Sequence, residues 1–199
     1  MKFEFVEKYK NCGLALPVRK TEHSAGYDLA AAEDIIIPSY QKHFNRMKAL
    51  CNTSNVYSLS EVANITKGLG TKPTLVPTGL KCKLETNTYL ELSVRSSTPL
   101  KSWLVLANGV GVIDADYYDN SDNEGHIFLQ FINLAPFDIK IKKGEYIGQA
   151  IIKPYLTVEN DIAVGTRTGG FGSTTVESPK PITKKIVLPK AVPNENTSS

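Results

Sequence analysis

The feature that most constrains the fold is a series of short segments in which apolar and polar residues alternate, such as 90–94 (LELSV) and 137–142 (FDIKIK). A period of two is typical of β-strands with one buried face. Turn-forming residues separate such segments at close spacing, at 77–79, 108–109, 119–125 and 143–144. The pattern predicts an all-β fold of the barrel kind.

Two regions depart from this alternation. In residues 40–72, Ser58 and Glu61 have the spacing of a helix capping box, and four residues offer an apolar face: Leu59, Val62, Ala63 and Leu69. We expect a helical insertion there. Residues 177–199 contain four prolines and few apolar residues, so they are predicted to form a disordered tail after a single domain of residues 1–176.

Charge and cysteine content narrow the class of protein. The 23 basic and 20 acidic residues give a net charge of +3, too small for the basic face of a nucleic-acid-binding protein. The first residues contain no long apolar run, so we expect no membrane segment. Three scattered cysteines, an odd number, favour reduced thiols in a cytoplasmic protein. A lone aromatic residue such as Trp103 is expected in the core.

Five segments rich in Gly, Asp, Arg or Ser carry the candidate chemistry: AGYDL (25–29), RSSTPLK (95–101), NGVGVIDADY (108–117), GEYIGQA (144–150) and RTGGFGST (167–174). Each segment alone has a simpler explanation. Glycines are common in turns, Arg95 could form a surface ion pair, and Asp114 could cap a hairpin. Together, in this order and spacing, they resemble the five motifs of the trimeric dUTPase family, from about Leu14 to Val176.

This resemblance implies a distorted jelly-roll barrel that hydrolyses dUTP to dUMP and pyrophosphate with Mg²⁺. It also implies a homotrimer in which three chains contribute to each active site. The insertion and the tail resemble elaborations of bacterial and phage members. The expected location is therefore the bacterial cytoplasm, or the host cytoplasm for a phage-encoded protein.

The third segment is predicted to bind the nucleoside. The turn at Asn108-Gly109 followed by Gly111, Val112 and Ile113 looks like a hairpin whose backbone amides and carbonyls pair with the edge of uracil. Such a backbone would leave the amino group of cytosine unpaired, which disfavours cytosine. The resemblance implies that Asn108 takes part and that Tyr117 packs under the deoxyribose.

Asp114 is predicted to be the general base, because hydrolysis of a phosphoanhydride needs a carboxylate beside the attacking water. The family places its catalytic aspartate at this position. Arg95, Ser96 and Ser97 supply a planar cation and hydroxyl groups suited to the α and β phosphates. Gln149 matches a phosphate-contacting glutamine, although burial within a strand would explain it equally.

Two further groups are assigned by resemblance. Asp28 matches an aspartate that is an outer-shell partner of Mg²⁺, an ion that takes most of its ligands from phosphates and water. Residues 165–176 would form a mobile arm that closes over the nucleotide, with Arg167 on the γ phosphate, Phe171 stacked on uracil, and Gly172 and Ser173 beside it. Arg167 lies one residue nearer the double glycine than in many relatives.

Two rival readings remain. A dCTP deaminase of the same fold uses a glutamate on the strand after the third motif, where this chain has Gln130, which cannot shuttle protons as a carboxylate does. A zinc cytidine deaminase would need a His-x-Glu and a Pro-Cys-x-x-Cys arrangement, but the three histidines are isolated and no two cysteines are close in the sequence. The second rival is a non-enzymatic role, with residues 40–72 as a binding surface for a regulatory protein.

Overall fold

The structure, a computed structural model, describes residues 1–170 except 53, 71, 164, 166 and 168. In this part of the chain a four-stranded sheet has the order β2 (Tyr27–Ala30), β11 (Tyr146–Pro154), β6 (Thr88–Ser93), β8 (Gly111–Ile113). A three-stranded sheet consists of β4 (Thr74–Pro77), β9 (Phe128–Asn133) and β7 (Leu104–Leu106). Two strand pairs complete the barrel: β1 (Lys2–Phe5) with β5 (Leu80–Lys83), and β3 (Ile35–Ile37) with β10 (Ile139–Ile141).

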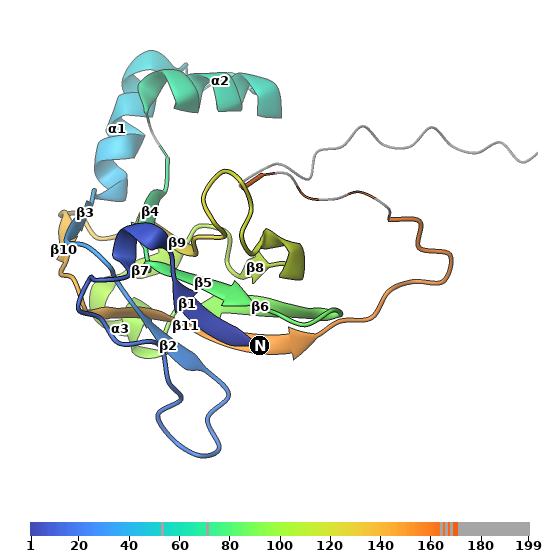
Figure 1. The fold of residues 1–199 in the computed structure, drawn as a ribbon. Helices are drawn as coiled ribbons and strands as arrows, with labels where there is room; N and C mark the ends of the chain where they lie inside the picture. The colour runs from blue at the N-terminus through green and yellow to red at the C-terminus, as the bar shows by residue number, and fades with distance from the viewer. Residues whose placement is uncertain (53, 71, 164, 166, 168, 171–199) are drawn as a thin grey trace, which may run out of the picture.

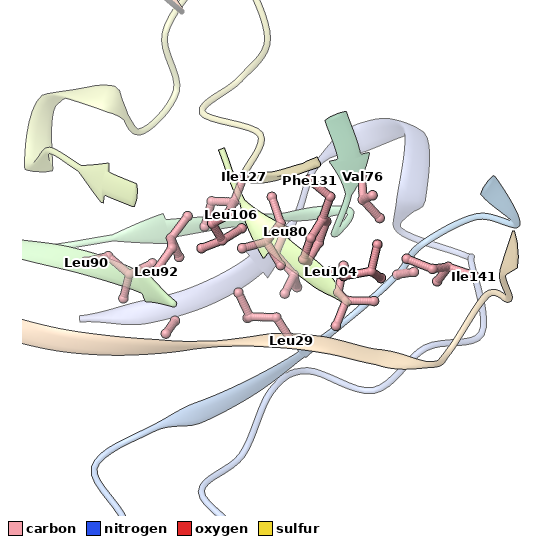
Figure 2. Packing of buried hydrophobic residues seen from close by; sticks show 14 of the residues in the cluster. Leu29, Val76, Leu80, Leu90, Leu92, Leu104, Leu106, Ile127, Phe131 and Ile141 are labelled. Carbon is pink, nitrogen blue, oxygen red and sulfur yellow. The ribbon is translucent and has the colours of Figure 1, made fainter. Parts of the chain in front are cut away.

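All of these strand pairs are antiparallel, and their inward residues form one apolar core (Figure 2). The predicted alternation of β6 is present, with Leu90 and Leu92 buried and Val94 packed against the core. From the opposite sheet, Leu129 and Phe131 of β9 meet them. The all-β prediction is confirmed because alternation places one face of each strand in a common interior.

Two helices, α1 (Tyr40–Leu50) and α2 (Leu59–Leu69), stand away from the sheets between β3 and β4 (Figure 1). We call residues 40–72 the helical arm. The capping box is present, since Ser58 accepts from the Glu61 backbone N–H and the Glu61 carboxylate accepts from the Ser58 N–H. The barrel does not cover the apolar face of α2: no residue of this helix, which is described throughout, is buried, and Leu59 is 91% exposed.

Three other expectations need correction. The turn at Asn108-Gly109 does not close a β-hairpin, because β7 pairs with β9 whereas β8 pairs with β6 in the other sheet. The strand expected at 137–142 is limited to β10, and Phe137 is 63% exposed in the preceding turn. Trp103 is 64% exposed, because it ends the short helix α3 (Ser97–Ser102) in a left-handed conformation.

Two short 3-10 helices, η1 (Glu7–Tyr9) and η2 (Ala115–Tyr117), complete the described elements. Within the described residues, every helix is too short or too polar to cross a membrane. The predicted tail, 177–199, lies outside the described residues.

Candidate active site

The register of the four-stranded sheet places three polar residues in one row across β2, β11 and β6. Gln149 lies opposite Asp28 on one side and opposite Ser93 on the other. Their neighbours Leu29, Ala150 and Leu92 point into the core. Because successive side chains of a strand alternate between faces, the polar row lies on the outer face of the sheet.

Arg95 extends this row, since it follows Ser93 by two residues and shares its face. Its Nε atom lies 3.4 Å from the Asp28 carboxylate, and its guanidinium lies 5.4 Å from the centre of the Tyr146 ring. Ser96 and Ser97 come next, where α3 begins, and the Ser96 hydroxyl makes no capping hydrogen bond. A cation, an amide and hydroxyl groups therefore meet where β2, β6 and β11 lie side by side.

Gln149 is half-buried, and its amide makes no hydrogen bond within the described residues. A Cβ atom at Gly26 would lie 2.6 Å from the Gln149 Oε1 atom. The glycine of AGYDL thus leaves room for this side chain. The alternative explanation, an amide satisfied by backbone groups, does not match this geometry.

Asp114 lies at the far end of the same sheet, directly after β8. Its side chain is 52% exposed, and its backbone carbonyl accepts from the Tyr117 N–H at 3.1 Å. Asn108 and Val112, predicted to bind the base, are also exposed, whereas Gly111 is buried and Ile113 is half-buried. The exposed carboxylate and the turn before it are accessible to a ligand.

Arg167 forms an ion pair with this carboxylate. Its guanidinium contacts the Asp114 carboxylate at 2.5 Å and the Asp116 carboxylate at 3.0 Å, and lies 5.5 Å from the centre of the Tyr117 ring. The backbone N–H of Gly170 donates to the Asp122 carboxylate at 2.8 Å. The first residues of the predicted arm therefore lie on the loop that follows β8.

Tyr117 is 5% exposed, more deeply buried than a residue expected to contact a sugar. Its hydroxyl donates to the His126 carbonyl at 3.0 Å and accepts from the Asn123 amide at 2.8 Å. Burial is the main cause of its raised pKa. Tyr117 thus holds the loop 117–126 in place, with its ring facing Arg167.

The two groups of predicted residues lie at opposite ends of β6. Ile113 lies opposite Leu90, and Arg95 is five residues further along the chain, two residues beyond the end of β6. At about 3.3 Å per residue, the five residues from Leu90 to Arg95 span about 16 Å when extended. Figure 1 shows this separation, with β8 and α3 at opposite sides of the barrel. We call Asp28, Arg95, Ser96, Ser97 and Gln149 the phosphate half-site, and Asn108, residues 111–114 and Tyr117 the nucleoside half-site.

A family model described as dUTPase matches residues 52–175. The deoxyuridine 5'-triphosphate nucleotidohydrolase of Lactococcus lactis is 41% identical over 86% of this chain and 95% of its own. The chain belongs to the dUTPase family. The crystal structure of a dUTPase from Streptococcus mutans, 35% identical, covers 80% of this chain and 99% of its own with a TM-score of 0.62.

Membership of the dUTPase family confirms the predicted fold and the predicted enzyme class. A dUTPase from phage phi11 of S. aureus, described as visualising a species-specific insert, is 15% identical with a TM-score of 0.55. It covers 84% of this chain and 98% of its own, and it shows likeness of fold alone.

Whether this dUTPase-family protein could hold a metal ion depends on the donor atoms that its side chains supply. The described residues contain no group of three or more His, Cys, Asp or Glu side chains that could hold a metal. Asp28 provides one carboxylate, 14% exposed, beside Arg95. This fits an ion such as Mg²⁺ that would take its oxygen ligands from a triphosphate and water, with Asp28 as an outer-shell partner.

Some predicted residues lie outside the described part of the chain, namely Phe171, Gly172 and Ser173 of the arm. Sequence reasoning gave no role to Asp116, Lys20 or Tyr146. The structure places Asp116 beside Arg167, Tyr146 beside Arg95, and Lys20 beside Tyr146. Tyr146 lies within GEYIGQA, so the sequence identified its motif but not the contacts that its side chain makes. Lys20 has no sequence signal of its own.

Proposed function

We propose that the protein hydrolyses dUTP to dUMP and pyrophosphate, with Asp114 as the general base. The observation that carries this proposal is the exposed Asp114 carboxylate directly after the turn that begins at Asn108. A base bound at that turn would place its sugar and α phosphate towards the carboxylate. Water bound to Asp114 would attack the α phosphorus, the bond from it to the bridging oxygen would break, and Asp114 would take the proton.

Neighbouring copies of the chain would complete each site. Asp114 and Arg95 would both act at the α phosphate, yet within one chain they lie near opposite ends of β6. In a closed symmetric oligomer, the phosphate half-site of one copy is able to lie against the nucleoside half-site of the next. We propose the homotrimer for this reason, with residues 165–176 as the arm that closes over the nucleotide.

The phosphate half-site would bind the α and β phosphates through Arg95, Ser96, Ser97 and Gln149, and orient them for in-line attack. Bound Mg²⁺ would neutralise part of the triphosphate charge. Arg167 contacts Asp114 and Asp116 in the structure, and bound substrate would offer it the γ phosphate instead. Residues 1–176 would be the catalytic domain of a cytoplasmic protein, which is consistent with three free cysteines.

The test is pyrophosphate release from dUTP, dCTP, dTTP and UTP, with and without Mg²⁺, for the wild type and Asp114→Asn. We expect Mg²⁺-dependent release from dUTP, lowered at least about a hundredfold by the substitution. Deamination of dCTP would instead support the deaminase, although Gln130 lies in β9 where that reaction needs a carboxylate. Inactivity towards all four nucleotides would contradict the proposal.

A second function, binding of a regulatory protein, is favoured by the helical arm. The apolar residues Val56 and Leu59 are 99% and 91% exposed. Five basic residues and one acidic residue in 40–72 give the arm a positive charge. Large exposed apolar side chains rimmed by charge are typical of protein contacts. A variant without the arm should keep dUTP hydrolysis and lose the partner, whereas loss of hydrolysis would show that the arm serves the barrel.

A further inference from the structure

Tyr146, the first residue of β11, carries two cations on its aromatic ring. The Lys20 Nζ atom lies 4.7 Å from the ring centre, and the Arg95 guanidinium carbon lies 5.4 Å from it. Lys20 also donates a hydrogen bond of 3.1 Å to the Tyr146 hydroxyl. The two charges therefore lie within about 10 Å of each other, the upper limit that the two ring distances allow.

The Tyr146 ring forms a wall shared by two hollows on this side of the barrel. One hollow, of about 250 Å³, is lined by Lys20 and Asp28. The other, of about 470 Å³, is lined by Arg95 and Lys101. The phosphate half-site thus continues past Tyr146 into the hollow where Lys20 adds a positive charge to that side of the barrel.

The charges around this ring are unbalanced in favour of an anion. Asp28 is the carboxylate that faces Arg95, at 3.4 Å, and Lys20 forms no ion pair within the described residues. Glu145, next to Tyr146, accepts instead from the Lys142 backbone N–H at 2.9 Å. The side chains that line the two hollows include four cations, Lys20, Arg95, Lys101 and Lys140, and two carboxylates, Asp28 and Glu145. They leave a positive excess that phosphate oxygens would neutralise.

Lys20 is not needed to hold its own loop in place. The neighbouring Arg19 guanidinium donates to the backbone carbonyls of Glu22 and Ser24, at 2.6 Å and 2.9 Å. These bonds close the loop that leads into β2. The long Lys20 side chain instead reaches across to β11, where its ammonium group remains available to a ligand.

We propose that Lys20 is a further phosphate-binding cation, oriented by Tyr146, which contacts the pyrophosphate part of dUTP. This inference rests on the proposed function, because it takes Arg95 as the group that binds the α and β phosphates. A triphosphate held at Arg95 extends over several ångströms, and Lys20 lies within that reach. Tyr146 is a positioning residue, since its ring supports both cations and its hydroxyl fixes Lys20.

The test compares Lys20→Met with Lys67→Met, which removes the same charge from the exposed face of the helical arm. Equilibrium binding is measured with Mg²⁺ for the α,β-imido analogue of dUTP, which is not hydrolysed, and for dUMP, which lacks the pyrophosphate. We expect Lys20→Met to bind the analogue about tenfold more weakly and dUMP unchanged, because one charged hydrogen bond is lost. Lys67→Met should bind both as the wild type does.

Two variants of Tyr146 separate its contributions. Tyr146→Phe keeps the ring beside both cations and loses the hydroxyl that fixes Lys20, so it should weaken analogue binding less than Lys20→Met does. Tyr146→Leu loses both supports and should weaken analogue binding further. Unchanged analogue affinity in Lys20→Met, or equal weakening of dUMP, would overturn the role of Lys20. A wild type that does not hydrolyse dUTP would contradict the proposed function itself, which is a different result.

Discussion

At the scale of single residues, the site depends on how closely the backbone approaches a few side chains. Gly26 and Gln149 lie on neighbouring strands, and the missing Cβ at Gly26 leaves space for the glutamine amide. The sequence identified both residues within motifs but not their contact. That contact depends on the register of β2 and β11, which motif spacing does not specify.

Gly26→Ala should weaken substrate binding while leaving stability nearly unchanged. The added Cβ would lie 2.6 Å from Gln149 Oε1, and the end of a flexible side chain moves at little cost. We expect a higher KM for dUTP and a Tm within about 2 °C of the wild type, which corresponds to less than about 1 kcal/mol. An unchanged KM would indicate that Gln149 does not contact the phosphates. Ala25→Gly serves as the control in the same loop.

His126 should make stability depend on pH. Its Nε2 accepts from the Gly79 N–H at 2.9 Å, and burial followed by the charge of Lys8 lowers its pKa from 6.5 to about 4. The unfolded chain therefore binds the proton first as the pH falls. Stability from this group is complete above pH 6.5 and decreases towards pH 4, by at most about 1.4 kcal/mol per pH unit.

Urea unfolding at pH 7.5, 6.0 and 5.0, at one protein concentration, measures this effect. His126→Gln keeps an acceptor for Gly79 and does not titrate. The difference in free energy of unfolding between wild type and variant should therefore become smaller as the pH falls. The carboxylates whose pKa values are lowered, such as Glu33, act mainly below pH 4.5 and are common to both proteins. If the difference in free energy of unfolding stays constant over this range, the lowered pKa of His126 is contradicted.

At the scale of elements, local signals predicted helices and strands better than they predicted their surroundings. The capping box at Ser58 depends on neighbouring residues alone, so sequence was sufficient to place the start of α2. Whether the apolar face of that helix is covered depends on other parts of the molecule. The barrel leaves it exposed.

Ser58→Ala should destabilise the helical arm without affecting the barrel. It removes a side-chain acceptor for the Glu61 N–H and half of a capping box, at a cost of about 1 kcal/mol. We expect faster hydrogen exchange of the α2 amides and unchanged dUTP turnover, because every residue assigned to the site lies outside 40–72. Asn64→Ala, which changes an exposed residue of the same helix outside the capping box, is the control. Reduced turnover would link the arm to catalysis.

At the scale of the whole molecule, the separation of the two half-sites predicts that chains with different defects complement each other. Arg95→Ala lacks the cation of the phosphate half-site, and Asp114→Asn lacks the general base. Each variant alone should therefore be nearly inactive. In mixed oligomers, some sites receive Arg95 from one chain and Asp114 from its neighbour. Random mixing at equal amounts makes about a quarter of the sites complete in a cyclic oligomer.

Co-expression with two affinity tags, followed by purification on both, isolates the mixed oligomers for the dUTP assay. Activity well above that of either variant would support shared sites. Activity no greater than that of the parents would contradict them and would require both half-sites to meet within one chain. Mixed oligomers of wild type and Arg95→Ala, purified identically, give the reference for tag effects.

The sequence by itself determined the all-β class, through residues that alternate with a period of two, and the family, through five motifs in a fixed order. These signals are local or depend only on order along the chain. Only the tertiary structure decided that Asp28, Gln149 and Arg95 form one row, that Asp114 lies at the other end of β6, and that Tyr146 joins Lys20 to Arg95. The physical reason is that strand register and sheet packing bring together residues distant in sequence, and no local pattern encodes those distances.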